Sequence, residues 1–216
     1  MVVSKPAGLS VQGGSGVGAS LDGILAAERP ERPLLAHRLD RDTSGLVLLA
    51  KGPAAAAAFA ALLGSPRRGG AGEGGGAAGG AVKRYLAVCR GRPPEPEGAV
   101  RLDLAERGGP KRAETRYRLL EELPCAGGLC LLELELGTGR THQIRRHMAM
   151  IGCPVAGDDR HGDFALNRAL KKGLGLRRML LHASRLVIPR MPDGSRLDVS
   201  APLPEHFERF LAAARA

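Results

Sequence analysis

The chain has 216 residues, of which 32 are basic, 22 acidic, 31 glycine and only six aromatic, and its formal net charge is +10. This length can bury a hydrophobic core, so neither a metal ion nor a disulfide is needed for stability, and the four cysteines form no CxxC pair. The sequence shows neither an apolar run of the roughly 18–20 residues that cross a membrane nor the apolar core of a signal peptide, so we expect reduced thiols and no membrane association.

The first third of the chain predicts a mixture of strands and helices. Val2–Val3 reads like a strand already in progress, and this abrupt entry favours a truncated amino terminus. A short helix is predicted over 21–27, with Ser20 as its N-cap. The apolar run at 46–50 predicts a buried strand, and the Ala-rich segment 53–63 predicts a helix that begins near its proline.

Residues 64–80 are almost entirely glycine, alanine and charged residues, with too little side-chain surface to bury. We interpret them as a flexible insertion, because strand-like sequence resumes at 82–88, and the proline-rich segment 92–98 is interpreted as a stiff loop. The remainder predicts strands over 113–121, 129–136, 179–188 and 197–201, and helices over 142–150, 163–172 and 205–214. The last helix would bury Phe207, Phe210 and Leu211. Without strict βαβ alternation, the pattern favours an α+β fold.

Most of the excess positive charge lies in one quarter of the chain. Between Arg140 and Arg190 there are eleven basic residues and only three acidic ones, which accounts for eight of the ten net positive charges. Such a segment indicates a polyanionic partner, either nucleic acid or an anionic membrane surface, although a solvated basic face is the plain alternative. With few aromatic residues to stack on single strands, phosphate contacts with folded RNA fit better.

The segment HRLDRDTSG, residues 37–45, places five ionisable residues in a predicted turn before a buried strand. Such a turn can present a side chain rigidly. Asp40 is flanked closely by Arg38 and Arg41, and nearby cations keep a carboxylate ionised and able to act as a nucleophile. A salt-bridged turn without catalytic function is the alternative at this point.

The same segment resembles the HRLDxxTSG signature of the RluA-type pseudouridine synthases, and further segments are similar to the family's motifs in the same order. These are KPAGL at 5–9, KRY at 83–85, GRTHQIR at 139–145, and GDDRHGD at 157–163 followed by LHA at 181–183. The last pair is most similar to the large-subunit rRNA branch of the family. The resemblance covers nearly the whole chain.

The resemblance implies one catalytic domain over 1–216 with an extended, mixed and mostly antiparallel sheet, flanked by helices and loops around a central active-site cleft. It implies that Asp40 is the nucleophile, that Tyr85 lies against the target base, and that Arg145 pairs with Asp40. Pseudouridine formation exchanges a carbon–nitrogen for a carbon–carbon glycosidic bond without redox change, so no metal and no organic cofactor is expected. The imidazoles of His37, His142, His147 and His182 are interpreted as structural or RNA-contacting, because no cysteine or carboxylate has matching metal-ligand spacing.

Further residues are predicted to contact RNA. Arg38 would fill the space left by a flipped uridine, and other contacts are expected from Arg41, Arg140, His142 and Arg160. The expected partner is structured RNA, first ribosomal and second transfer RNA, bound by a monomer in a bacterial cytoplasm, or in an organelle if the source is eukaryotic. The S4-type RNA-binding domain that many relatives carry before the catalytic domain is not expected in these 216 residues.

Two other functions remain open on sequence grounds. The run Asp40–Thr43 mimics the DxDxT motif of magnesium-dependent haloacid dehalogenase-type phosphatases, but the long apolar strand follows the motif instead of preceding it. A ribosome- or RNA-binding module that has lost catalysis is the second alternative. The joint presence of Asp40, Tyr85 and Arg145 argues against it, because binding alone would not require these three residues.

Overall fold

The computed structural model describes residues 1–14, 18–64, 80–125 and 128–216. The chain forms two compact units: unit 1 comprises residues 1–83 and 183–201, and unit 2 comprises residues 84–182 and 202–216. The predicted flexible insertion lies outside the described residues, apart from its end residues Gly64 and Gly80. Two compact units can belong to one catalytic domain, so the single domain over 1–216 stays a prediction.

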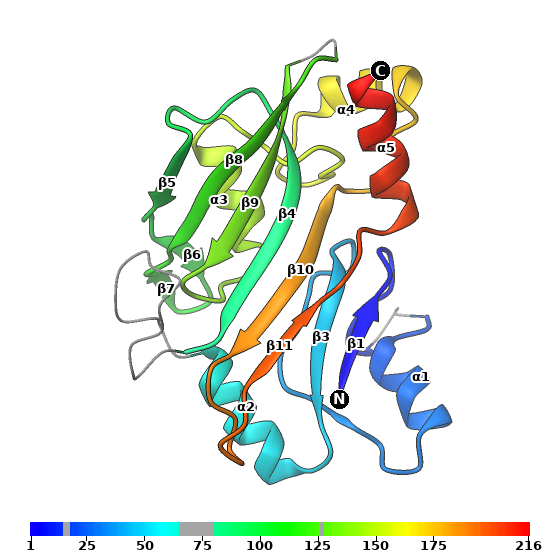
Figure 1. The fold of residues 1–216 in the computed structure, drawn as a ribbon, viewed down its shortest axis with the longest axis vertical. Helices are drawn as coiled ribbons and strands as arrows, with labels where there is room; N and C mark the ends of the chain where they lie inside the picture. The colour runs from blue at the N-terminus through cyan, green and yellow to red at the C-terminus, as the bar shows by residue number, and fades with distance from the viewer. Residues whose placement is uncertain (15–17, 65–79, 126–127) are drawn as a thin grey trace. The chain divides into compact units, whose positions relative to one another are not determined.

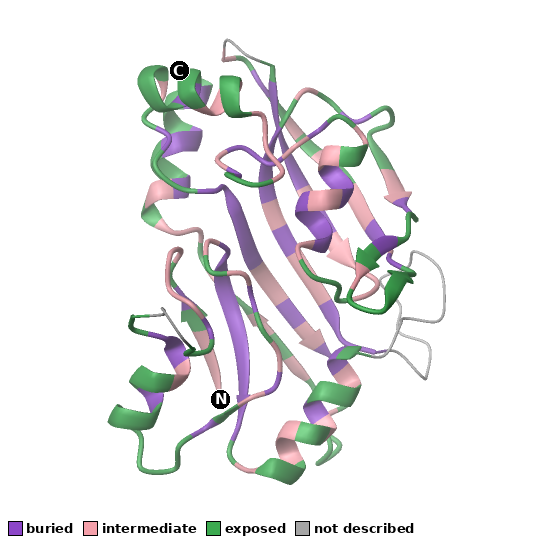
Figure 2. Cartoon of the chain, turned by 180° about the vertical axis from the view of Figure 1, so that it is seen from behind, coloured by how far each residue is buried: buried purple, intermediate pink, exposed green. Residues whose placement is uncertain are grey.

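Unit 1 is organised around a wholly buried strand, β3 (Ser44–Ala50). Its residues are small or apolar, as expected of a strand that is covered on both faces, and Figure 2 shows it buried along its length. β1 (Val2–Lys5) and β2 (Leu34–Leu35) pair with β3 in antiparallel orientation. β10 (Leu181–Ile188) follows β3 in the strand order and pairs with β11 (Leu197–Ser200), also antiparallel.

Two helices complete unit 1, and both begin where the sequence predicts (Figure 1). α1 (Leu21–Glu28) is capped by the Ser20 hydroxyl, which accepts a hydrogen bond from the Gly23 amide at 3.4 Å. α2 (Pro53–Gly64) begins with a proline, whose fixed φ and missing N–H suit the first helical turn. Phe59 of α2 packs in a core cluster with Leu48 of β3 and Ile188 of β10.

Within unit 2, the described residues form a sheet of antiparallel strands in the order β4, β9, β8, β5. The bounds are β4 (Val82–Arg90), β5 (Glu97–Val100), β8 (Thr115–Leu123) and β9 (Leu129–Leu136). The strands predicted over 82–88, 113–121 and 129–136 are confirmed. The loop predicted over 92–98 is wrong at its end, because Glu97 and Gly98 pair with Arg118 and Tyr117 of β8.

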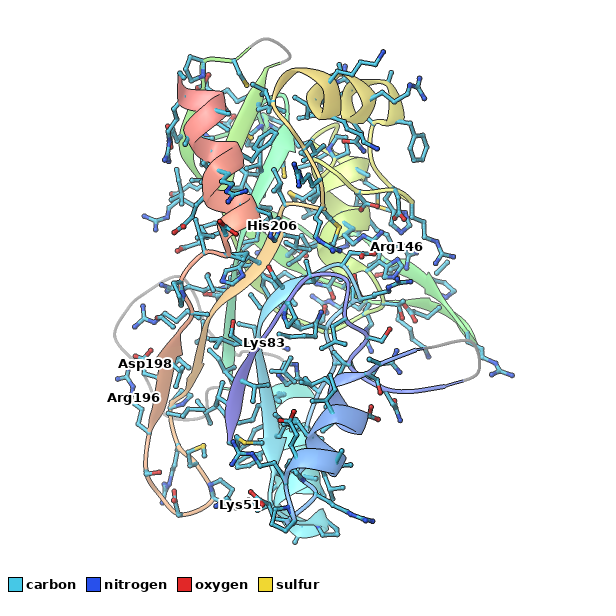
Figure 3. All side chains as sticks on the ribbon, turned by 90° about the vertical axis from the view of Figure 1, so that its right-hand side faces the viewer. Lys51, Lys83, Arg146, Arg196, Asp198 and His206 are labelled. Carbon is cyan, nitrogen blue, oxygen red and sulfur yellow. The ribbon has the colours of Figure 1, made fainter. Side chains whose placement is uncertain are left out.

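A short hairpin of β6 (Leu104–Glu106) and β7 (Gly109–Lys111) was not predicted. Gly108 in its turn and Gly109 at the start of β7 have φ of 94° and 102°, values that residues other than glycine rarely adopt. Arg146 of α3 (Gln143–Met150), labelled in Figure 3, donates a hydrogen bond of 3.1 Å to the Ala105 carbonyl. The hairpin is therefore held to α3 by a side chain from outside the hairpin.

The core of unit 2 lies where α4 (Phe164–Gly173) and α5 (Glu205–Arg215) meet the sheet. Phe207, Phe210 and Leu211 of α5 are buried as predicted, in one cluster with Leu170 of α4 and Val88 of β4. The predicted helices over 142–150, 163–172 and 205–214 are confirmed within one residue at each end.

No helix that the structure describes combines the length and apolarity needed to cross a membrane. All four cysteines are free thiols. Burial raises the pKa of the Cys130 thiol to about 12, so this buried thiol is held in its protonated, unreactive form.

Candidate active site

Asp40 lies in a turn between β2 and β3 of unit 1. A hydrogen bond of 3.2 Å from the Thr43 amide to the Asp40 carbonyl closes the turn. Leu39 before the carboxylate and Thr43 and Ser44 after it are buried, whereas Asp40 itself is half-buried. The turn therefore carries two partly exposed carboxylates, those of Asp40 and Asp42, on a backbone whose two ends are fixed in the protein interior.

The glycine of the HRLDRDTSG segment has a steric explanation. Gly45 has φ of +109°, and a Cβ atom added there would lie 2.2 Å from the Ala183 carbonyl oxygen. No side chain fits at this distance, so only glycine lets β3 approach β10 directly after the Asp40 turn. This close approach fixes the start of β3, the strand that follows the turn.

Lys5 is bonded to the same turn and is only 1% exposed. Its ammonium donates hydrogen bonds to the carbonyl oxygens of Pro6 at 2.9 Å, Leu9 at 2.8 Å and Arg41 at 2.9 Å. Burial lowers the pKa of Lys5 to about 8, against the opposing effect of the Asp42 and Asp40 charges. The buried Lys5 ammonium thus bonds the end of β1 to Arg41, the residue that follows Asp40. It also places a positive charge near the carboxylates of Asp40 and Asp42.

The arginines and the histidine of the turn have different surroundings. The Arg41 Nε donates a hydrogen bond of 3.1 Å to the Gly8 carbonyl, so this residue, predicted to contact RNA, also has a structural function. Arg38 is exposed, as a residue predicted to contact RNA requires. The His37 Nε2 accepts a hydrogen bond of 3.0 Å from the Leu48 amide, which explains this histidine as structural. Burial, with a smaller effect of the Lys83 charge, lowers the pKa of His37 to about 4.

In unit 2, Arg145 forms a buried bidentate ion pair with Asp158. Its Nε and Nη2 donate to the two carboxylate oxygens, each at 2.7 Å, and the two residues are 4% and 0% exposed. The same carboxylate accepts the backbone amides of Arg160 at 2.8 Å and His161 at 2.9 Å. Burial pushes the pKa of Asp158 upward, but the bonds from Arg145 and the two amides outweigh this effect and hold the pKa below its usual value.

The Arg145–Asp158 pair was not predicted, although both residues lie in segments that resemble family motifs. It fixes the guanidinium of α3 in one orientation and organises the 158–161 loop through its amides. The predicted pairing of Arg145 with Asp40 joins residues of different units and stays a prediction.

Gln143 was likewise missed and holds the loop before α3 together. Its side-chain oxygen accepts from the Thr138 hydroxyl at 2.6 Å and the Arg140 amide at 3.0 Å, while its amide donates to the Glu114 carbonyl at 2.7 Å. The glutamine of GRTHQIR is therefore a structural residue that joins the loop to β8. Only its place inside the motif could have indicated this function.

The predicted RNA-contacting residues of unit 2 lie on this loop and on the 158–161 loop. Arg140 is exposed, and its Nε donates to the Arg112 carbonyl at 3.2 Å. His142 adopts a left-handed backbone with φ of 51°, and its Nδ1 lies 3.0 Å from the Nε2 of His161. Arg160 is exposed next to this histidine pair. The loop geometry thus brings His142 and the Arg160–His161 segment together.

Tyr85 lies in β4, opposite Leu134 of β9, and is 6% exposed. A buried tyrosine within a strand has a restricted ring position, which suits a residue that lies against a base. Its predicted contact with the target base stays a prediction.

Two of the remaining histidines are buried in the interior of unit 2. The ring nitrogens of His147 lie 3.0 Å from the Thr115 hydroxyl and 3.0 Å from the Leu102 carbonyl oxygen, which supports the structural interpretation of this residue. His182 is 1% exposed. Across the part of the chain that the structure describes, no cluster of three or more histidine, cysteine or acidic side chains has the geometry of a metal site.

Unit 1 thus presents a carboxylate on an anchored turn, and unit 2 holds a buried arginine in a bidentate ion pair. The sequence model of the RNA pseudouridylate synthases matches residues 1–150. This chain is 34% identical to ribosomal large subunit pseudouridine synthase C of Haemophilus ducreyi and 34% identical to that of Escherichia coli, in each case over 100% of this chain and 67% of the relative. The chain belongs to the RNA pseudouridylate synthase family.

A solved structure supports the fold assignment independently. The human protein RNA pseudouridylate synthase domain containing 4 has a TM-score of 0.75 at 24% identity, over 99% of this chain and 89% of that one. The predicted pseudouridine synthase fold is therefore confirmed.

Proposed function

We propose that this chain converts specific uridines of large-subunit ribosomal RNA into pseudouridine, with the Asp40 carboxylate as nucleophile. The family match spans all three predicted catalytic residues: Asp40, Tyr85 and Arg145. Both bacterial relatives are named for the large ribosomal subunit, and this chain aligns with them over its whole length. The observation that carries the proposal is the anchored turn that presents Asp40, with Lys5 bonded beneath it.

The proposed reaction conserves all atoms and electrons of the nucleotide. The N1–C1′ bond of uridine breaks, the uracil turns, and a C5–C1′ bond forms, while C5 loses a proton and N1 gains one. An ionised carboxylate can assist by attack at C1′ or at C6, or by starting an elimination at the sugar. In each path Asp40 acts as an ionised carboxylate.

The proposal gives Arg145 two separate tasks. Its Nε and Nη2 are engaged by Asp158 in the bidentate pair, which sets the plane of the guanidinium. We propose that Nη1 is the nitrogen that orients Asp40. Tyr85, held on β4, would supply a ring for the flipped uracil and a hydroxyl for the proton that leaves C5.

RNA contacts in the proposal come from the exposed arginines and from the half-buried His142. Extracting a uridine from folded RNA costs a few kcal/mol of stacking, and Arg38 beside Asp40 would occupy the vacated space. Arg41, Arg140, His142 and Arg160 would contact the flanking backbone. We further propose that the protein acts as a monomer in the bacterial cytoplasm, in line with its bacterial relatives.

Mapping of pseudouridines in total RNA tests the proposed function, with cells that have and lack the gene. We expect one or a few positions of large-subunit rRNA to lose the modification in the cells without the gene. Loss confined to transfer RNA would assign the protein to that substrate instead, and an unchanged map would refute the function. Activity of the purified protein in excess chelator, on RNA that stays folded, would exclude the magnesium-dependent phosphatase.

A further inference from the structure

Helix α4 presents a basic and aromatic face away from the core. At about 100° per residue, its four large exposed side chains fall within about 100° of one another. They are Phe164, Arg168, Lys171 and Lys172. The opposite side of the helix carries Leu166 and Leu170, which pack in the core cluster with α5, as does Leu174 directly after the helix. The helix is therefore fixed by one side and free for contact on the other.

The charges on this face are not neutralised within unit 2. No carboxylate in the described ranges forms an ion pair with Arg168, Lys171 or Lys172. The nearest acidic residue in sequence, Asp163, is already engaged: it caps α4 by accepting the Leu166 amide at 2.9 Å and pairs with Arg90 at 3.0 Å. Three cations therefore remain on one helix face.

Phe164 differs from the other phenylalanines of the chain. It is 53% exposed, whereas Phe59, Phe207 and Phe210 are at most 9% exposed. The two lysines of the last turn would complement the helix dipole, but that effect explains neither Arg168 in the middle nor an exposed ring in the first turn. An exposed aromatic ring beside cations suits a nucleic-acid partner, because every base can stack on such a ring.

We propose that this α4 face, composed of Phe164, Arg168, Lys171 and Lys172, is a docking surface for structured RNA outside the predicted catalytic residues. The three cations contact phosphates, and the Phe164 ring stacks on an unpaired base. The choice of RNA as partner rests on the proposed function and on charge complementarity. A single ring without further apolar residues on the face gives little area to insert into a membrane. The face would lengthen the contact with RNA and help to select the substrate.

The test compares two triple variants of the full chain that remove the same charge. One is R168Q/K171Q/K172Q. The other is R118Q/R196Q/R209Q, which removes three exposed arginines already paired with Glu133, Asp198 and Glu205 (Arg196 and Asp198 are labelled in Figure 3). Affinity for in vitro transcribed large-subunit rRNA is measured at several salt concentrations, together with F164A and F164Y.

At about 150 mM salt, we expect the α4 triple variant to bind RNA at least about tenfold more weakly than the wild type. The slope of log affinity against log salt concentration should fall by an amount that corresponds to about two to three phosphate contacts. The control triple variant should change affinity less than about threefold. F164A should weaken RNA binding about fivefold or more, whereas F164Y, which keeps an aromatic ring, should bind like the wild type. Equal effects of the two triple variants, or none, would overturn the proposal. So would an α4 triple variant that binds RNA normally but no longer binds vesicles containing anionic lipid.

The outcomes separate this inference from the proposed function. If the wild-type protein binds the RNA through the α4 face but forms no pseudouridine, the proposed activity fails and the docking surface stands. If the wild-type protein forms pseudouridine and the α4 triple variant matches it in affinity, the docking surface fails and the activity stands.

Discussion

Arg145 donates two hydrogen bonds of 2.7 Å to Asp158, and neither side chain is more than 5% exposed. A buried ion pair of this kind adds little net stability, because the desolvation of the two charges offsets much of their attraction. Its main effect is to fix the two side chains in one arrangement. Removal of one partner is costly, since the other buried charge then loses hydrogen bonds that water cannot replace. The pair therefore defines the position of a candidate catalytic arginine through a residue outside the predicted catalytic set.

We predict that Asp158→Asn lowers the free energy of unfolding by about 3 kcal/mol or more, because the buried Arg145 guanidinium loses the carboxylate that accepts its two hydrogen bonds of 2.7 Å. Urea denaturation measures this loss. The matched control is Asp159→Asn, since Asp159 has an exposed side chain (84%) and lies 3.6 Å from the same guanidinium. Equal stability losses in the two variants would contradict the account of the buried pair.

We predict that Lys5→Met weakens both the fold and the activity, because three carbonyl oxygens lose their buried donor. The expected loss of unfolding free energy is about 1–3 kcal/mol, with a further fall in the rate of pseudouridine formation as the Asp40 turn loosens. Lys51→Met is the control with the same charge change, because Lys51 is exposed (Figure 3). A Lys5→Met protein that matches the control in both measurements would show that the ammonium does not hold the turn.

The His37 environment predicts a pH dependence of stability. Its pKa is lowered to about 4 in the folded protein from an ordinary value of 6.5, so between these values the unfolded chain binds the proton and the folded chain does not. The free energy of unfolding should therefore fall as pH drops from about 6.5 to about 4.

The variant His37→Gln isolates this contribution from that of the other histidines. Its amide oxygen can still accept from the Leu48 amide, but it cannot take up a proton. We expect the difference between wild type and variant to vary with pH in this window and to be constant above about pH 7. Parallel stability curves across the window would mean that His37 does not titrate as described.

Local signals were enough to predict most of the fold. Ser20 and Pro53 marked two helix starts, and the alternation of leucine and glutamate predicted β9. The short strands β5, β6 and β7 were not predictable, because glycine, proline and charged residues form them only through pairing with a neighbour.

The candidate site was predictable only in part, for a related reason. Asp40, Tyr85 and Arg145 stand in recognisable segments, and family membership supports their selection. The residues that hold them also lie in segments that resemble family motifs, but the sequence does not indicate their contacts. Asp158 lies 13 residues from Arg145, and a lysine such as Lys5 is ordinarily expected at the surface.

The most direct test of the central claim is the pair of variants Asp40→Asn and Asp42→Asn, assayed for pseudouridine formation in large-subunit rRNA. The two carboxylates lie in the same turn, and the charges of both act on Lys5, so the variants perturb the local charge alike. We predict that Asp40→Asn abolishes product while binding RNA and unfolding like the wild type, and that Asp42→Asn retains most activity. Product formation by Asp40→Asn would contradict the assignment of Asp40 as the nucleophile.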